Sequence, residues 1–139
     1  MGEILKIGME HKKFAFDREA KPVATIHSGD RVVFETEDAN CSLITKETDL
    51  WAEFPKLYAK GGGCNPVTGP VYVEGAHPGD CLSVKILRVV PGFIRNGGYT
   101  SIYSGRGMLQ DCKGSLQQPL EPLTKICPIE GDEIHFKLH

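Results

Sequence analysis

The stretch Val71-Tyr-Val-Glu-Gly-Ala-His-Pro-Gly-Asp-Cys-Leu-Ser-Val-Lys-Ile86 contains the pattern that decides the fold. It begins as a short β-like run, passes through a turn built on Pro78-Gly79-Asp80, and continues with apolar residues at alternate positions. The same unit, a Gly-Asp turn ahead of an alternating strand, recurs at residues 28–36 and 130–138. A β-like run also precedes each turn, so we expect a strand, a turn and a second strand in each of three places.

The three alternating segments predict one shared core. Strands of this kind place every second side chain on the same face, and those side chains are apolar here. The residues expected on the buried face are Val32 and Phe34, then Leu82, Val84 and Ile86, and finally Ile134, Phe136 and Leu138. With 16 Gly and 9 Pro in 139 residues, the pattern favours a mainly β chain, a β-sandwich or jelly roll, forming a single domain over residues 1–139.

Two further segments complete the expected fold. Asp49 can cap a short helix over residues 50–60, which the three glycines that follow would end. Residues 91–107 are rich in glycine with aromatic residues between, and we expect a long loop or lid there.

Charge and composition exclude several classes of function. The net charge of −2 is spread along the chain without a run of Lys or Arg, which makes nucleic acid an unlikely partner. No apolar run is long enough to cross a bilayer, so we expect no membrane span. Five cysteines in no paired spacing predict reduced thiols and a cytoplasmic location.

The stretch Asn65-Pro-Val-Thr-Gly-Pro-Val-Tyr-Val-Glu-Gly-Ala-His-Pro-Gly-Asp80 resembles the signature of the acetamidase/formamidase family. The resemblance extends over nearly the whole chain, but it covers only the front half of a family member. The Gly-, Asp- and His-rich segments that such members carry further on have no counterpart here. The other matching segments are 11–17, 22–30, 33–39 and, more weakly, 107–111 and 129–136.

This resemblance implies a sandwich with an added mixed sheet, and hydrolysis of short linear amides such as formamide or acetamide to a carboxylate and ammonia. That reaction needs an activated water or nucleophile, donors to the tetrahedral oxyanion, and a proton for the departing ammonia. With only the front half present, we expect the chain to act with a second copy or a second chain that completes the fold. The alternative is a non-catalytic β-sandwich module that binds a partner through an exposed face.

Two carboxylates are the candidate catalytic residues. Glu74 stands at a strand end between two rigid turns, which can hold a polar reacting group without a flexible loop. Asp38 ends the strand that follows the turn at Gly29-Asp30. The structural alternatives are an exposed Glu in a hairpin and an Asp that caps a turn. We predict that the two carboxylates face a common cleft.

Candidate ligands for substrate and metal complete the site. Asn65 and Thr68 are the candidate substrate-binding residues, with the Asn65 amide as a donor to a carbonyl oxygen. His11 and Asp17 could contribute to a divalent metal site with Asp38, since imidazole and carboxylate suit zinc and carboxylate suits calcium. No spacing motif in the sequence indicates which metal ion would bind or whether one is required.

Overall fold

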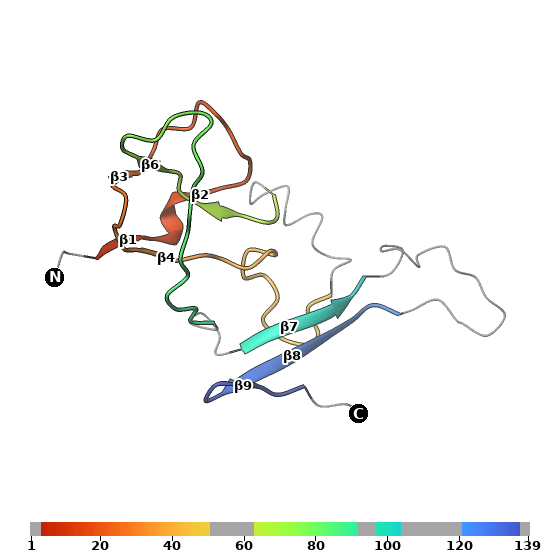
Figure 1. Cartoon of the computed structure of the whole chain (residues 1–139). Helices are drawn as coiled ribbons and strands as arrows, with labels where there is room; N and C mark the ends of the chain where they lie inside the picture. Colours follow the sequence, from red (N-terminus) through yellow and green to blue (C-terminus); the bar gives the residue numbers. More distant parts are fainter. Residues whose placement is uncertain (1–3, 51–62, 92–96, 104–120, 137–139) are drawn as a thin grey trace. The chain divides into compact units, whose positions relative to one another are not determined.

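The computed structural model describes residues 4–50, 63–91, 97–103 and 121–136 (Figure 1). These residues form nine short strands and one turn of 3-10 helix, which confirms the prediction of a mainly β chain. They divide into two compact units, Met1–Cys41 with Gly62–Leu87 and Ser42–Gly61 with Arg88–His139. That the whole chain is one domain, as the sequence predicts, stays a prediction.

The first unit is built from three pairs of strands. Two pairs are parallel, so the chain leaves the first strand at one end of the pair and must return to the opposite end before the second strand begins. The 3-10 helix η1 (Met9–His11) lies between the first two strands of the chain. The pairs are β1 (Leu5–Ile7) with β4 (Val32–Phe34), β2 (Lys12–Lys13) with β5 (Val67–Thr68), and β3 (Ala24–Ile26) with β6 (Val71–Val73).

One turn occurs twice in this unit, and the repeated sequence His-x-Gly-Asp explains it. In each copy the Asp carboxylate accepts a hydrogen bond of 2.8 Å from the backbone N–H of the His, and the Asp N–H donates back to the His carbonyl. The glycines at the third position, Gly29 and Gly79, have φ of +92° and +102°, which a side chain would strain. The turns therefore form as predicted at residues 27–30 and 77–80.

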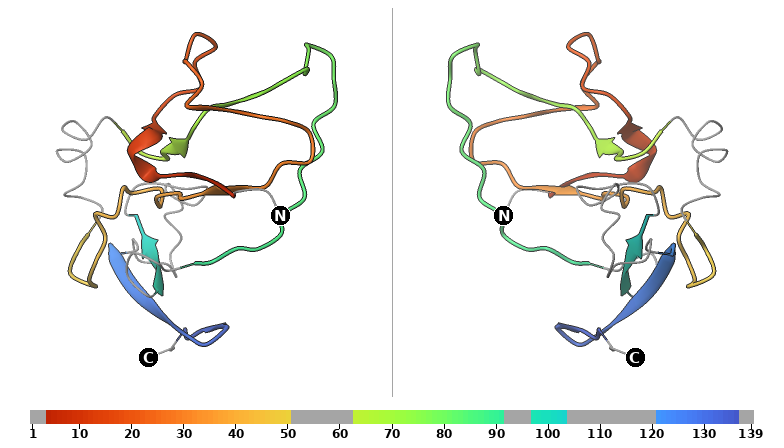
Figure 2. Two further views of the ribbon diagram at one scale, coloured as in Figure 1. Left: turned by 90° about the vertical axis from the view of Figure 1, so that its left-hand side faces the viewer. Right: turned by 90° about the vertical axis from the view of Figure 1, so that its right-hand side faces the viewer.

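The second unit contains a three-stranded antiparallel sheet, β7 (Gly97–Ile102), β8 (Leu123–Glu130) and β9 (Glu133–Ile134). Both views in Figure 2 show β7 and β8 side by side. The third Gly-Asp pair closes the hairpin between β8 and β9, with Gly131 at φ +65°. Thr124 of β8 is fully buried, and its hydroxyl donates to the Asp49 carbonyl at 2.7 Å.

The prediction of a loop throughout residues 91–107 is wrong in its central part, because Gly97–Ile102 is a strand. Tyr99, Thr100 and Ile102 favour extended backbone, and six residues of β7 pair in register with β8. Gly97 permits this pairing, since a Cβ there would lie 2.8 Å from the Cys127 carbonyl oxygen. The glycines of this segment therefore did not indicate a loop, because Gly97 allows β7 to approach β8 closely.

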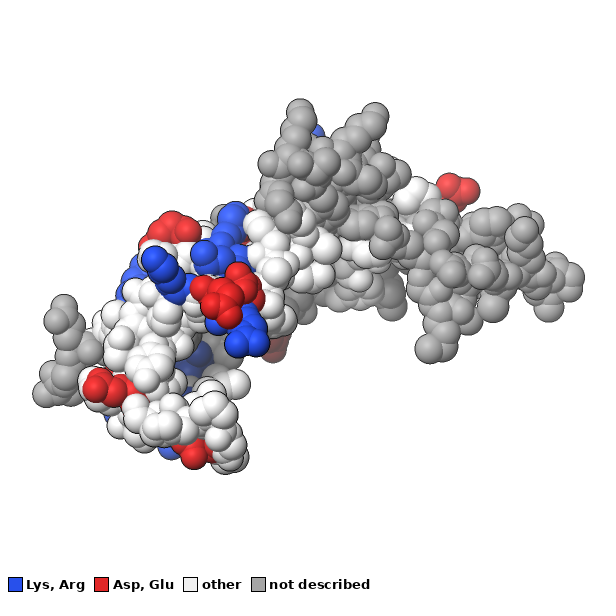
Figure 3. Space-filling model, turned by 90° about the horizontal axis from the view of Figure 1, so that it is seen from above, with Lys and Arg blue, Asp and Glu red and all other residues white. Residues whose placement is uncertain are grey.

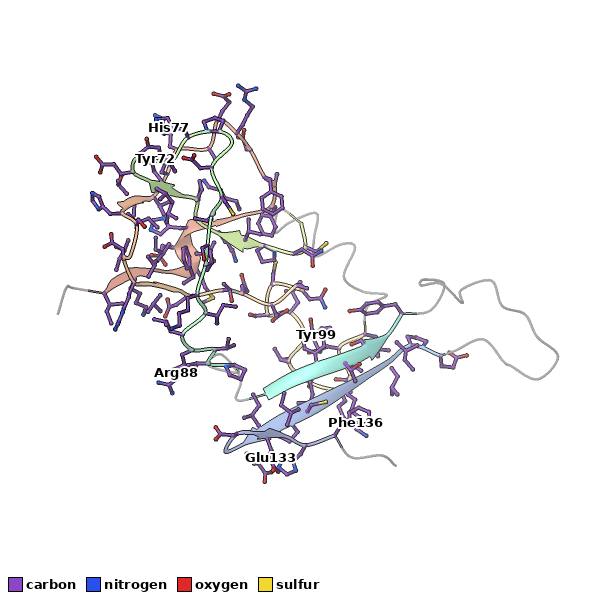
Figure 4. All side chains as sticks on the ribbon, in the orientation of Figure 1. Tyr72, His77, Arg88, Tyr99, Glu133 and Phe136 are labelled. Atoms are coloured by element: carbon purple, nitrogen blue, oxygen red, sulfur yellow. The ribbon has the colours of Figure 1, made fainter. Side chains whose placement is uncertain are left out.

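The predicted core is also wrong in all three alternating segments, since Phe34 of the first segment is 43% exposed. Residues 81–90 form no strand, and Leu82, Val84 and Ile86 are 70–76% exposed. Ile134 and Phe136 are exposed as well, although the Lys125 ammonium lies 4.7 Å from the centre of the Phe136 ring, beside β8 in Figure 4. Alternating apolar residues form a buried face only where another element packs against them, and these side chains remain exposed among the described residues.

Other sequence-based expectations have mixed outcomes. The helix predicted over 50–60 lies, except for Leu50, outside the described residues, as does Leu138. The carboxylate of Asp49, expected to cap that helix, accepts hydrogen bonds from Thr45 and Lys46. In the part of the chain that the structure describes, no helix is long and apolar enough to cross a membrane.

Candidate functional site

Glu74 is fixed by the parallel pairing of β3 and β6. The register aligns Ile26 with Val73, and the Glu74 N–H continues the ladder by donating to the Ile26 carbonyl at 2.8 Å. The chain then turns at once, with the Ala76 N–H donating to the Val73 carbonyl. The expected place of Glu74, at a strand end before a rigid turn, is therefore the observed one.

The Glu74 side chain lies against His27, which follows the neighbouring strand. In a parallel pair, residues at matching positions project on the same face, so the register that aligns Ile26 with Val73 also brings His27 beside Glu74. The His27 Nε2 atom is 2.9 Å from the Glu74 Oε2 atom, and its Nδ1 atom is 3.5 Å from Asp30 Oδ2. A carboxylate thus faces each ring nitrogen.

Asp38, Asn65 and Thr68 lie on two segments that run side by side. The Asn65 N–H donates to the Ala39 carbonyl at 2.8 Å, and the Thr68 hydroxyl donates to the Glu35 carbonyl at 2.7 Å. The Asp38 carboxylate accepts the Asn40 N–H, which is the turn-capping geometry of the structural alternative. The Asn65 amide lies 3.4 Å from the Cys64 sulfur.

The structure thus places the predicted residues in two groups of contacts. Glu74 contacts His27, which also faces Asp30. Asp38 lies on a segment that the Asn65–Ala39 and Thr68–Glu35 hydrogen bonds join to the segment of Asn65 and Thr68. All of them lie in the first unit. A common cleft for Glu74 and Asp38 stays a prediction.

An ion pair that the sequence analysis missed lies beside Asp38. The Lys12 ammonium is 2.6 Å from the Glu37 carboxylate, whose side chain is only 11% exposed. This hydrogen bond to Glu37 raises the pKa of Lys12, which therefore stays charged. Burial raises the pKa of the nearby Cys41 thiol, whose sulfur contacts the Gly63 carbonyl. The sequence signal is a pair of basic residues, Lys12 and Lys13, and a pair of acidic residues, Glu35 and Glu37, but nothing local in the sequence indicates that Lys12 and Glu37 meet.

His11 and Asp17 are each engaged locally. The His11 Nε2 atom is 3.4 Å from Glu10, and the Asp17 carboxylate accepts the Glu19 N–H. Among the described residues, no three His, Cys, Asp or Glu side chains are gathered so that they could hold a metal ion. The metal ligands stay a prediction, and His11 and Asp17 would need partners from elsewhere.

Charges of both signs lie close together on the surface of the described residues. Figure 3 shows basic and acidic side chains interspersed on one face of the described residues. Two ion pairs of the first unit, Lys6–Glu35 at 2.7 Å and Lys12–Glu37 at 2.6 Å, bring opposite charges together. On the described residues of this face, neighbouring charges of opposite sign interrupt any continuous basic strip of the kind that follows a phosphate backbone.

Comparisons with known proteins agree on one family. A family model described as the Acetamidase/Formamidase family matches residues 8–127. An acetamidase structure from Bacillus halodurans is 32% identical, with a TM-score of 0.70 over 96% of this chain and 40% of that one. A predicted acetamidase/formamidase from Thermoanaerobacter tengcongensis is 28% identical, with a TM-score of 0.68 over 97% of this chain and 41% of that one.

An acetamidase structure from Yersinia enterocolitica is 25% identical and has a TM-score of 0.65, over 95% of this chain and 40% of that one. The chain thus spans about two fifths of the length of these structures. No curated protein sequence matches it.

Proposed function

Because the chain belongs to the acetamidase/formamidase family, we propose that it takes part in hydrolysing short linear amides, such as formamide or acetamide, to a carboxylate and ammonia. The observation that carries this proposal is the family match over residues 8–127, which includes Asp38, Asn65, Thr68 and Glu74. Since the chain spans 40% of the acetamidase structures, we assign the activity to an assembly that includes further sequence, from a second copy or another chain.

Amide hydrolysis requires a general base that removes a proton from the attacking water. In the proposed step, Glu74 takes a proton from water while the water oxygen bonds to the amide carbon and the carbonyl electron pair moves to the oxygen. The tetrahedral intermediate then collapses, the C–N bond breaks, and the proton passes to the departing nitrogen as ammonia leaves. The Glu74 side chain is 60% exposed, which leaves its carboxylate accessible to water.

Asp38, Asn65 and Thr68 complete the proposal. The Asn65 amide would donate to the developing oxyanion, Thr68 would line the substrate site, and Asp38 would serve as the second acid or base. Support comes from the backbone hydrogen bond of Asn65 to Ala39, which holds the segments of Asp38 and Asn65 together. Glu74 and Asp38 would then meet at one bound amide.

The experiment that tests this function uses the complete assembly. Incubation with formamide or acetamide should release ammonia and the matching carboxylate in equal amounts. A non-catalytic module, the alternative function, would release neither. A folded assembly that produces no ammonia from short linear amides would contradict the proposal.

A metal requirement is tested separately. If His11 and Asp17 bind zinc or calcium with help from outside the described residues, extensive treatment with a chelator should abolish ammonia release, and one ion should restore it. The variant H11A should then lower the metal content measured by mass spectrometry. Full activity in a protein without metal would remove both residues from a metal role.

A further inference from the structure

We infer that His27, held by Asp30, is a positioning residue for the Glu74 carboxylate. The inference rests on the proposed function, because it assigns His27 a task only if Glu74 is the base. No sequence motif pointed to His27, and the structure brings it to Glu74 through the pairing of two strands that are distant in sequence.

The ring of His27 is held from two directions. The Asp30 carboxylate accepts the His27 backbone N–H at 2.8 Å, and the same oxygen lies 3.5 Å from the ring Nδ1 atom. This turn orients the ring, so that Nε2 reaches Glu74 Oε2 at 2.9 Å. Donation from Nε2–H to one carboxylate oxygen fixes the plane of the carboxylate, and the other oxygen can then accept the proton of water.

Folding stability does not account for this contact. The side chains of His27 and Glu74 are 66% and 60% exposed, and ion pairs at such exposure contribute little to folding. If His27 positions Glu74, its removal should change the free energy of unfolding little and should lower turnover strongly.

The chain supplies a matched control in its second copy of the same turn. His77 and Asp80 repeat the hydrogen bonds of His27 and Asp30, with the His77 Nδ1 atom 4.0 Å from the Asp80 carboxylate. Among the described residues, His77 faces the carboxylate of Asp80, within its own turn. His77 follows β6, which ends at Val73, and it is labelled in Figure 4. His77 therefore shares the turn but not the contact with Glu74.

The test is a double-mutant cycle on the complete assembly, with ammonia release from formamide as the readout. H27A should lower kcat by about tenfold to a hundredfold with a smaller change in KM, because misplacement of a base affects the transition state more than substrate binding. H77A should keep the wild-type rate. H27A added to E74Q should cause no further loss, since His27 acts through Glu74.

A conservative variant separates positioning from a general structural effect. In H27Q, the side-chain amide can place a donor near the position of Nε2, so its kcat should lie between those of H27A and the wild type. Thermal unfolding of H27A should match that of H77A.

The outcomes distinguish this inference from the proposed function. If E74Q keeps the wild-type rate, the role of Glu74 fails and the inference fails with it. If E74Q loses its rate while H27A does not, or if the two losses multiply in the double variant, the inference alone is overturned.

Discussion

At the scale of single residues, turn chemistry was the most reliable guide. The sequence placed Gly29, Gly79 and Glu74 correctly because a Gly-Asp turn is determined by its own residues. The partner of Glu74 could not be predicted in the same way. His27 reaches it through the pairing of β3 with β6, and that depends on residues far apart in the chain.

The thiols provide a prediction at this scale. Cys64 is exposed, whereas Cys41 is half-buried and burial raises its pKa. Because the thiolate is the reactive form, iodoacetamide at pH 8 should label Cys64 about tenfold faster than Cys41. The rate at Cys41 should rise as the pH increases further, since burial raises the pKa of this thiol and more thiolate forms at higher pH.

Peptide mapping by mass spectrometry measures both rates in one sample. In denaturant the two cysteines should react alike, which controls for sequence effects. Equal rates in the folded chain would contradict the described burial of Cys41.

At the scale of elements, strands were predictable where a local pattern and a covering neighbour coincide. The runs before the turns are strands β3, β6 and β8, as expected. Residues 81–86 have the same alternation but no strand partner among the described residues, and their apolar side chains are exposed. Hydrophobic alternation shows that a segment can form a half-buried strand, but the strand forms only where a neighbouring strand pairs with it.

The glycines of β7 provide a matched pair of substitutions. G97A should destabilise the second unit by about 1–3 kcal/mol, because the new methyl group would lie 2.8 Å from the Cys127 carbonyl and the backbone must shift. At Gly98 a Cβ meets no atom within 4 Å among the described residues, so G98A should be neutral or slightly stabilising. Urea unfolding of both variants measures the difference. Equal stability of the two would show that β7 and β8 do not pair as described.

Thr124 links β8 to the turn that ends at Asp49. T124V replaces the hydroxyl with a methyl group of similar size and leaves the Asp49 carbonyl without this donor. We expect a loss of about 1–3 kcal/mol, since the site is fully buried. T124S keeps the hydroxyl and should lose less. A T124V protein as stable as the wild type would show that this hydrogen bond is not formed.

At the scale of the whole molecule, the mainly β class and the family could be predicted from the sequence. Composition, turns and alternation determine the class, and the stretch 65–80 carries the family resemblance. The predicted core failed at Leu82, Val84 and Ile86 because burial depends on what covers a strand. The acetamidase structures extend well beyond the length that this chain spans.

The exposed segment 81–87 predicts association. A segment that has no strand partner among the described residues and exposes apolar side chains can pair with another strand, so the chain should not remain monomeric at micromolar concentration. V84K should weaken association without unfolding the first unit, since Val84 is exposed. Sedimentation velocity measures both. A compact 15.3 kDa species that does not associate would contradict this prediction.

The central claim is that Glu74 serves amide hydrolysis, and ammonia release by the complete assembly carrying E74Q tests it most directly. The control is E130Q, since Glu130 also faces a histidine, His135 at 3.7 Å, but lies in the second unit. The account predicts that E74Q lowers turnover of formamide by ~10²–10⁴ with unchanged unfolding, while E130Q keeps the wild-type rate. Turnover by E74Q at the wild-type rate would contradict the account and assign the chemistry to other residues.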